Sequence, residues 1–258
     1  MDLGIAGRTA LVTGSARGTG LVIARRLIEE GARVLVHGLA DGQAERAVVE
    51  IGGGVPVTGD ITHDAGSAQL LRACAHERVD ILINNYGTAD SGSWDDSDSD
   101  DWLLAYQKNV LSAQRLIRAL LPDMRARPFG RIINLGTVGS TQPNARMPQY
   151  YAAKGALATM TISLAREVAG TAIRVNLVSP GLILTPEVEA AWLERGRARG
   201  WGSTWDEIEP HVAADIPIRR IARREEVADL VAFLASPRAD AIHGQNIRID
   251  GGAMKTLT

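Results

Sequence analysis

Residues 9–20 read TALVTGSARGTG, a short apolar and β-branched run followed by a turn with glycines at positions 14, 18 and 20. The apolar residues of the run are consecutive rather than alternating, which is typical of a strand covered on both faces of its sheet. After the turn, apolar residues recur three and four positions apart over Gly20–Glu30, the spacing of a helix with one buried face. The stretch therefore predicts a strand, a tight turn and a helix in a layered α/β protein.

The same alternation of strand and helix continues along the chain. Short runs rich in β-branched residues are separated by longer helical patterns such as Trp102–Met124. Alternating units of this kind form parallel sheets with right-handed crossovers, so we expect an α/β single-domain, doubly wound (Rossmann) sheet with helices on both faces. No internal repeat or linker divides residues 1–258. The predicted strands are Thr9–Thr13, Arg33–His37, Val79–Ile83, Arg131–Leu135 and Ile173–Val178.

The composition excludes several classes of function. With 28 Lys and Arg against 30 Asp and Glu, the formal net charge is -2, which argues against binding to nucleic acid or to a membrane surface. The single cysteine, Cys74, excludes a disulfide framework and a cysteine-rich zinc site, and we expect no metal. The first residues lack the pattern of a secretory signal, and no apolar stretch approaches the roughly 18 residues of a membrane span. We therefore expect a cytoplasmic protein.

Two stretches depart from the alternating pattern. Residues 91–102, SGSWDDSDSDDW, predict a surface loop whose serines and aspartates cap the following helix, because their spacing fits no calcium-binding loop. Residues 187–216 form an insertion that carries Trp192, Trp201 and Trp205. Such an insertion is either a substrate lid or a packed helical hairpin or subunit interface, and the sequence does not choose between them.

The turn after the first strand has the features of a phosphate-binding loop. Gly14, Gly18 and Gly20 permit a tight turn and let backbone N–H groups approach a pyrophosphate at the helix N-terminus. A glycine-rich turn alone is a weak signal, but here it follows a strand and opens a helix, as the motif requires. We therefore predict that this loop binds a dinucleotide.

The end of the second predicted strand indicates which dinucleotide. His37 is followed by Gly38 and Leu39, so no carboxylate stands at the strand end to accept hydrogen bonds from a ribose. The uncharged end leaves space for a 2′-phosphate, to which Arg17 could supply a cation and Ser15 a hydroxyl. Arg17 could instead be a solvated loop residue. We expect NADP(H) in preference to NAD(H).

Tyr150 and Lys154 are the candidate catalytic pair. Four residues apart on a predicted helix, they lie on one face within reach of each other. A free tyrosine has a pKa of about 10, and a neighbouring ammonium should lower it toward a value useful for proton transfer. Any helix can place these residue types at this spacing, so the pair alone does not decide the function.

Motifs along nearly the whole chain resemble those of the short-chain dehydrogenases/reductases, in the order typical of that family. They are the loop Thr13–Gly20, the run Asn84-Asn85-Tyr86-Gly87, Tyr150 with Lys154, the run 180–185 and the pattern Gly244-Gln245…Asp250-Gly251-Gly252. The resemblance implies hydride transfer between nicotinamide and a carbonyl or secondary alcohol, and a homodimer or homotetramer.

The resemblance also implies roles for single residues. Tyr150 would be the general acid/base, Lys154 would tune it and hold the nicotinamide ribose, and Asn109 would anchor a water in a proton relay. Asn109 could also be only a local hydrogen-bonding residue of its helix. The residues that would contact the cofactor are Gly14, Ser15, Arg17, Gly18, Thr19, Gly20, Asp60, Ile61, Asn84, Gly87, Tyr150, Lys154, Pro180, Gly181, Ile183 and Thr185.

The sequence departs from the family pattern at three positions. Where the family has a serine thirteen residues before the tyrosine, this chain has Thr137, which keeps the hydroxyl but adds a methyl group. Ser140 is a nearby hydroxyl at the wrong offset. Tyr86 replaces the usual alanine and either packs on the sheet or lines the substrate entrance. Leu39 replaces the arginine common in NADP-using members.

The sequence thus predicts an NAD(P)-dependent oxidoreductase acting on a small carbonyl or alcohol. A 3-oxoacyl carrier-protein reductase is the alternative within the family, with Arg195, Arg197 and Arg199 as candidate contacts to an acidic carrier. A non-catalytic NAD(P)-binding sensor or assembly subunit is the alternative from another class. The intact set of Thr137, Tyr150, Lys154 and Asn109 argues against it.

Overall fold

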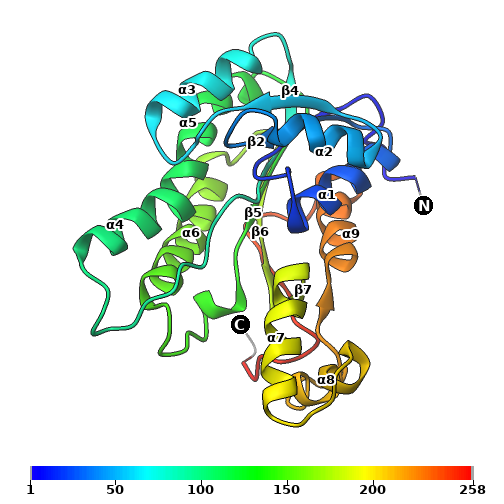
Figure 1. Cartoon of the computed structure of the whole chain (residues 1–258). Coiled ribbons are helices and arrows are strands. Elements are labelled where there is room, and N and C mark those ends of the chain that lie inside the picture. The colour runs from blue at the N-terminus through cyan, green and yellow to red at the C-terminus, as the bar shows by residue number, and fades with distance from the viewer. Residues whose placement is uncertain (1, 257–258) are drawn as a thin grey trace.

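The computed structural model describes residues 2–256. Its centre is a seven-stranded sheet in the order β3-β2-β1-β4-β5-β6-β9, in which every neighbouring pair is parallel (Figure 1). This order reverses direction after β1, which confirms the doubly wound sheet. The strands are β1 (Thr9–Val12), β2 (Arg33–Gly38), β3 (Val55–Thr58), β4 (Val79–Asn84), β5 (Gly130–Leu135), β6 (Ile173–Pro180) and β9 (Asn246–Ile249).

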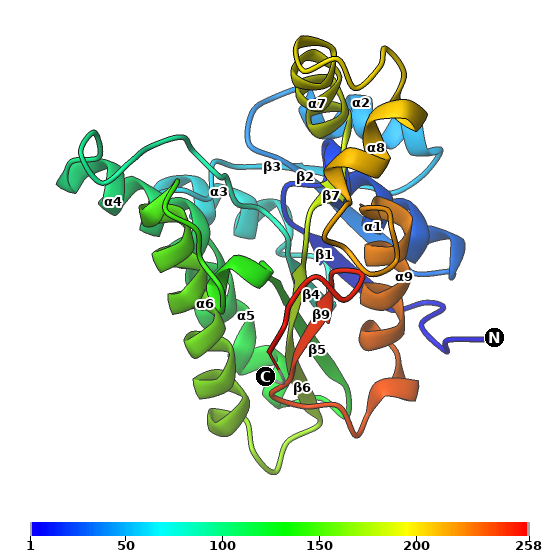
Figure 2. The same cartoon turned by 90° about the horizontal axis from the view of Figure 1, so that it is seen from below.

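Helices cover both faces of the sheet, as predicted (Figure 2). One layer consists of α1 (Gly18–Glu29), α2 (Gln43–Ile51) and α9 (Arg224–Ala235). The other consists of α3 (Asp64–Ala73), α4 (Ser99–Tyr106), α5 (Ser112–Arg125) and α6 (Pro148–Glu167). The remaining elements are a π-helix (Gln107–Leu111), 3₁₀ turns at Val138–Ser140 and Pro237–Ala239, α7 (Pro186–Ala198), α8 (Trp205–Val212), and the two-stranded sheet of β7 (Ile183–Leu184) and β8 (Ala222–Arg223).

The central strands are apolar throughout because each of their faces has its own hydrophobic core. In β1, Ala10 and Val12 point into the cluster under α1 and α9, whereas Leu11 points into the cluster under α5 and α6. All three side chains are fully buried. The consecutive apolar run therefore reflects alternation between two cores.

The two stretches that broke the pattern are both ordered. In the acidic stretch, the Asp98 carboxylate accepts from the backbone N–H groups of Asp100 (2.9 Å) and Asp101 (3.0 Å), which confirms the predicted cap at the start of α4. The insertion forms a packed helical hairpin of α7 and α8. Its helices meet closely, since a Cβ at Gly196 would lie 2.6 Å from Ile208, and the Trp201 ring stacks with those of Trp192 (6.3 Å) and His211 (4.9 Å).

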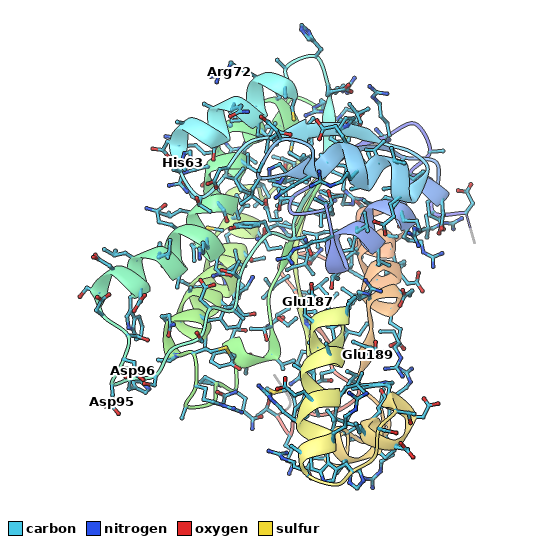
Figure 3. The ribbon with its side chains drawn as sticks, in the orientation of Figure 1. His63, Arg72, Asp95, Asp96, Glu187 and Glu189 are labelled. Atoms are coloured by element: carbon cyan, nitrogen blue, oxygen red, sulfur yellow. The ribbon has the colours of Figure 1, made fainter. Side chains whose placement is uncertain are left out.

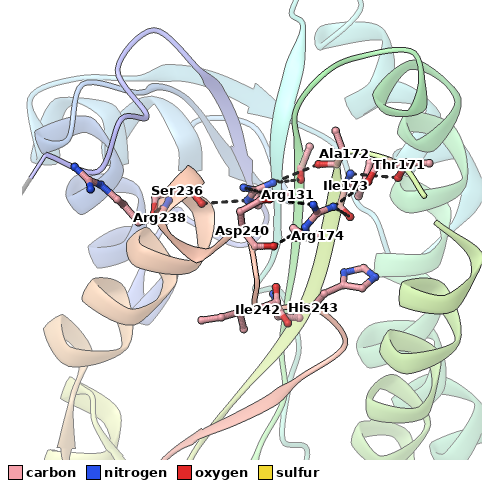
Figure 4. A network of polar contacts seen from close by, with 12 residues as sticks. Arg131, Thr171, Ala172, Ile173, Arg174, Ser236, Arg238, Asp240, Ile242 and His243 are labelled. Atoms are coloured by element: carbon pink, nitrogen blue, oxygen red, sulfur yellow. Dashed lines mark hydrogen bonds and ion pairs between the residues drawn. The ribbon is translucent and has the colours of Figure 1, made fainter. Parts of the chain in front are cut away.

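At the amino-terminal edge of the sheet, a buried arginine joins three segments (Figure 4). Arg131 is only 1% exposed, and its guanidinium donates to the carbonyl of Ser236 (3.2 Å) and to the carboxylate of Asp240 (3.1 Å). Arg174 binds the other oxygen of Asp240 (3.1 Å). This network ties β5 and β6 to the segment after α9, at the edge of the sheet away from the predicted site.

Candidate active site

The glycine-rich loop takes the compact shape that the sequence predicts. Gly14 and Gly18 have φ angles of 61° and 62°, in the left-handed region that favours glycine. A Cβ at Gly20 would lie 2.5 Å from the Gly14 carbonyl oxygen, so only glycine fits there. A Cβ at Gly18 would meet nothing within 4 Å, so this position faces open space beside the first turn of α1.

Two residues that were given no role in the sequence analysis hold this loop in place. The side-chain amide of Asn85 donates to the carbonyls of Thr13 (2.9 Å) and Gly14 (3.2 Å). The fully buried ring of His37 accepts from the Gly14 N–H through Nδ1 (3.0 Å) and donates from Nε2 to the Gly59 carbonyl (2.8 Å). Burial lowers the pKa of His37, which favours the neutral ring that both contacts require. The sequence signal for the role of His37 was its polar side chain at the end of an otherwise apolar strand.

The role expected for the Ser15 hydroxyl needs correction. This side chain is fully buried, donates to the Val12 carbonyl (2.7 Å) and accepts from the His37 N–H (2.8 Å). The hydroxyl therefore braces β1 against β2 and is not free to contact a 2′-phosphate. The Arg17 guanidinium is exposed and lies 3.4 Å from the carboxylate of Glu187 on α7.

The other expected cofactor residues lie along the carboxyl edge of the sheet, but their side chains differ in access. Asp60 is partly exposed and accepts from the Thr62 N–H (3.0 Å) and hydroxyl (2.7 Å). Ile61 is buried in the core, so any contact it makes with a ligand is through its backbone. Asn84 is buried and donates to Asn134 (2.8 Å), which in turn donates to Thr161 (2.8 Å).

The segment after β6 completes this edge. Pro180 ends the strand, and the Gly181 N–H donates to the Ile249 carbonyl (3.1 Å). A Cβ at Gly181 would meet Asp250 at 3.0 Å, which explains the glycine. Ile183 lies in the short strand β7. Thr185 caps α7, accepting from the Val188 N–H (3.3 Å).

The start of α6 brings the candidate catalytic residues together. Tyr150 is partly exposed, and its hydroxyl lies near the side chain of Thr137 after β5. Lys154 lies one turn along the helix, with Nζ 6.0 Å from the centre of the Tyr150 ring, and donates to the Leu135 carbonyl (2.8 Å). The hydroxyl of Ser140 donates to the Thr137 carbonyl (2.8 Å) and so is already engaged with the backbone.

The expected lowering of the Tyr150 pKa is not found. Burial, and to a lesser extent Tyr151, raises the pKa of Tyr150 to about 12, and the nearby Thr137 side chain opposes this only in part. Burial also lowers the pKa of Lys154 to about 8, because a charged ammonium loses hydration there. Helical spacing alone does not reveal this desolvation, which is the largest influence on the pKa of both residues.

Asn109 and Lys154 border a gap beside Gly87. The Asn109 amide donates to the carbonyls of Thr88 (3.0 Å) and Ala105 (3.0 Å), whereas its buried Oδ1 has no hydrogen-bond partner among the described residues. A Cβ at Gly87 would lie 2.5 Å from this Oδ1 and 3.0 Å from the Lys154 Nζ. A buried acceptor facing an ammonium across a glycine is suited to hold a water.

The position of Asn109 depends on a feature that the sequence did not reveal. The continuous helix expected over Trp102–Met124 is interrupted by the π-helix Gln107–Leu111, which carries Asn109 at its middle. Wider turns of this kind are frequent at functional sites. The helical periodicity of the apolar residues gave no signal for it.

Tyr86 lies against the phosphate loop. A Cβ at Gly14 would be 3.1 Å from the Cα and Cβ of Tyr86, and the Tyr86 N–H donates to the Thr13 hydroxyl (3.0 Å). Its side chain packs against the core under α5 and α6, and burial raises its pKa to about 12. Of the two alternatives for this residue, the structure supports packing on the sheet.

A phosphate cradle at a helix N-terminus, beside a tyrosine, a lysine and a hydroxyl donor, defines a nicotinamide-dependent oxidoreductase site. The chain belongs to the short-chain dehydrogenase/reductase family: residues 14–254 match the family described as enoyl-(acyl carrier protein) reductase. It is accordingly an NAD(P)-dependent oxidoreductase acting on carbonyl or alcohol substrates. Family membership favours an enzyme over the sensor alternative.

Several relatives match over nearly their full length. The chain is 33% identical to the uncharacterized oxidoreductase YvaG of Bacillus subtilis over 100% of both chains. It is 34% identical to the 3-oxoacyl-acyl-carrier-protein reductase FabG of Vibrio cholerae over 97% of this chain and 98% of that protein. Among solved structures, L-sorbose reductase from Gluconobacter frateurii, in complex with NADPH and L-sorbose, superimposes with a TM-score of 0.92 at 34% identity over 100% of both chains.

Proposed function

We propose that this protein is an NADPH-dependent reductase of small polar ketones. The observation that carries the proposal is that the Tyr150 and Thr137 hydroxyls lie close together near the glycine-rich loop. Lys154 lies one helical turn from Tyr150. A proton donor, a second hydroxyl and a lysine near a phosphate cradle are the groups that carbonyl reduction needs.

Tyr150 acts as the general acid. With a pKa of about 12, its phenol stays protonated at neutral pH and is ready to donate when negative charge develops on a carbonyl oxygen. Thr137 lies beside the Tyr150 hydroxyl and presents a second donor to the same oxygen. When bound, a nicotinamide would supply the hydride, and these two hydroxyls would stabilise the negative charge that develops on the carbonyl oxygen.

Lys154 and Asn109 return a proton to Tyr150. The Lys154 ammonium, with a pKa of about 8, is close to the acidity at which it can both give and take a proton near neutrality. The unpaired Oδ1 of Asn109 fixes a water next to it in the gap beside Gly87. This water links the buried lysine to solvent, as in a relay.

The residues present fit a nicotinamide dinucleotide. Gly14, Gly18 and Gly20 open the backbone of the cradle toward a pyrophosphate, and Arg17 stands beside it with an exposed guanidinium. Arg17 and the absence of a strand-end carboxylate favour NADP(H) over NAD(H). The solved L-sorbose reductase contains NADPH, and a 3-oxoacyl (acyl-carrier-protein) reductase from Agrobacterium tumefaciens, similar with a TM-score of 0.86 at 30% identity, contains NADP.

The substrate class is inferred from the likeness to L-sorbose reductase, which extends over both whole chains. Although the hairpin of α7 and α8 is packed within itself, we propose that it also serves as the substrate lid of the 1–258 domain, because Glu187 at its start contacts Arg17 on the phosphate loop. A 3-oxoacyl carrier-protein reductase is the second candidate, favoured by the likeness to FabG and by the three arginines at 195, 197 and 199 on and just after α7.

We further propose a cytoplasmic homodimer or homotetramer. Large apolar side chains are exposed around α4, among them Trp94 (70%) and Leu103 (64%), which is more than an isolated surface helix needs. Within residues 2–256, no helix is long and apolar enough to cross a membrane, and no cluster of His, Cys, Asp or Glu could hold a metal ion. Light scattering of the purified protein tests the assembly.

The decisive experiment is a turnover screen. The purified protein is given NADPH or NADH with L-sorbose, other ketoses, simple ketones and an acetoacetyl thioester, and cofactor oxidation is followed by absorbance. The proposal predicts the highest kcat/KM with NADPH and a hydroxylated ketone. Preference for the thioester would establish the second candidate instead, and turnover with none of these compounds would contradict both.

A further inference from the structure

The phosphate loop and the helical hairpin are joined by one ion pair between residues far apart in sequence. Arg17 Nη1 lies 3.4 Å from the carboxylate of Glu187, and the two side chains are 83% and 63% exposed. Figure 3 shows Glu187 at the first turn of α7, with Glu189 close by on the same turn. Arg17 is the cation that the proposed function assigns to the 2′-phosphate, so this contact bears on cofactor choice.

The carboxylate of Glu187 is held in place by its own helix end. Its own backbone N–H and the hydroxyl of Thr185, the residue that caps α7, lie near it. Together with nearby Arg17 and Arg224, these contacts keep the pKa of Glu187 below its usual value. Glu187 is therefore a negative charge at the start of α7, facing a loop arginine whose side chain is largely exposed.

We propose that Glu187 is a cofactor-specificity residue, an internal counter-ion that competes with the 2′-phosphate of NADPH for Arg17. The inference rests on the proposed use of NADPH. A phosphate offers the guanidinium nearly two charges and several acceptor oxygens, so it displaces a single exposed carboxylate. The displaced Glu187 then remains near the bound phosphate and repels it.

The competition affects the two cofactors unequally. NADH has no 2′-phosphate, so it leaves the pair of Arg17 and Glu187 intact, whereas NADPH must break it. Glu187 thus reduces the preference for NADPH that Arg17 creates. Because exposed ion pairs contribute little, we expect a tuning effect of about two- to five-fold in affinity rather than a reversal of preference.

The test is a double-mutant cycle with both cofactors. Dissociation constants for NADPH and NADH are measured by calorimetry for the parent, Glu187→Gln, Arg17→Ala and the double variant. We expect Glu187→Gln to raise the preference for NADPH over NADH about two- to five-fold, and Glu187→Ala to do the same. In the Arg17→Ala background, Glu187→Gln should leave the preference unchanged. Glu189→Gln removes a charge from the same turn and should leave it unchanged in both backgrounds.

The outcomes separate this inference from the function on which it rests. If Arg17→Ala weakens NADPH selectively but Glu187→Gln does not change the preference, or lowers it, the role of Glu187 is refuted and NADPH use stands. A gain in preference that persists without Arg17 also refutes competition for that side chain. If the parent binds both cofactors equally and Arg17→Ala weakens both alike, the proposed NADPH preference itself is wrong.

Discussion

Replacing Gly87 by alanine tests the gap between Asn109 and Lys154. The added Cβ would lie 2.5 Å from the Asn109 Oδ1, whereas ordinary van der Waals contact begins at 3.4 Å. It would also lie 3.0 Å from the Lys154 Nζ. Asn109 must therefore move by roughly 1 Å, and the methyl group also displaces the water that we place there.

We expect Gly87→Ala to lower kcat by about a hundredfold at saturating NADPH, because a displacement of about 1 Å in a catalytic group typically has this effect. Overpacking should also lower the free energy of unfolding by about 1–3 kcal/mol, which leaves the chain folded. Stopped-flow turnover of the best ketone measures the first effect, and urea denaturation measures the second.

Gly155→Ala is the matched control on the catalytic helix. A Cβ at Gly155 would come no closer than 3.9 Å to the Ser140 carbonyl oxygen, so it meets only ordinary contact. This variant should keep kcat within about twofold and gain up to about 1 kcal/mol of stability from the better helix propensity of alanine. If Gly87→Ala also keeps kcat within threefold of the parent, the gap takes no part in proton transfer.

Two further changes address the substrate oxygen and the phosphate loop. Thr137→Ser should retain kcat within a few-fold. Thr137→Ala should lower kcat about 100- to 1,000-fold, the usual effect of removing an oxyanion donor. Near-parent turnover of Thr137→Ala would assign the oxyanion contact to another hydroxyl. His37 is buried with a pKa below its ordinary 6.5, so its contribution to stability is complete above pH 6.5 and is lost as the pH falls through the folded-state pKa. Urea denaturation at pH 7.5 and 5.5 should therefore show a loss, of up to about 1.4 kcal/mol per pH unit, that is reduced in His37→Asn. An equal loss in both proteins would assign the pH dependence to other groups.

Much of the fold was predictable because its signals are local. A strand covered on both faces needs a consecutive apolar run, as in β1. The tight turn that follows needs glycine at positions 14, 18 and 20. Tyr150 and Lys154 were predictable from their helical spacing. By contrast, the π-helix that carries Asn109 leaves the apolar periodicity unchanged, so no sequence pattern announced it.

The contacts made between distant segments could not be predicted. The ring of His37 and the amide of Asn85 reach across strands to the loop, and the ion pair of Arg17 and Glu187 joins residues 170 positions apart. The strand end has a steric constraint that the sequence did not reveal, since a side chain at Gly38 would meet the Gln43 Cβ at 2.7 Å. The close approach of α2 therefore excludes any side chain, a carboxylate included, at this position.

The direct test of the central claim is the comparison of Tyr150→Phe with Tyr151→Phe. The Tyr151 hydroxyl only accepts from the exposed Asn144 amide (2.8 Å), so it serves as the control for loss of a phenol from the same helix. We predict that Tyr150→Phe lowers kcat a hundredfold or more while the Kd for NADPH stays within threefold, and that Tyr151→Phe keeps most of the activity. Comparable losses in the two variants, or a Tyr150→Phe enzyme with near-parent turnover, would contradict the assignment of Tyr150 as the proton donor.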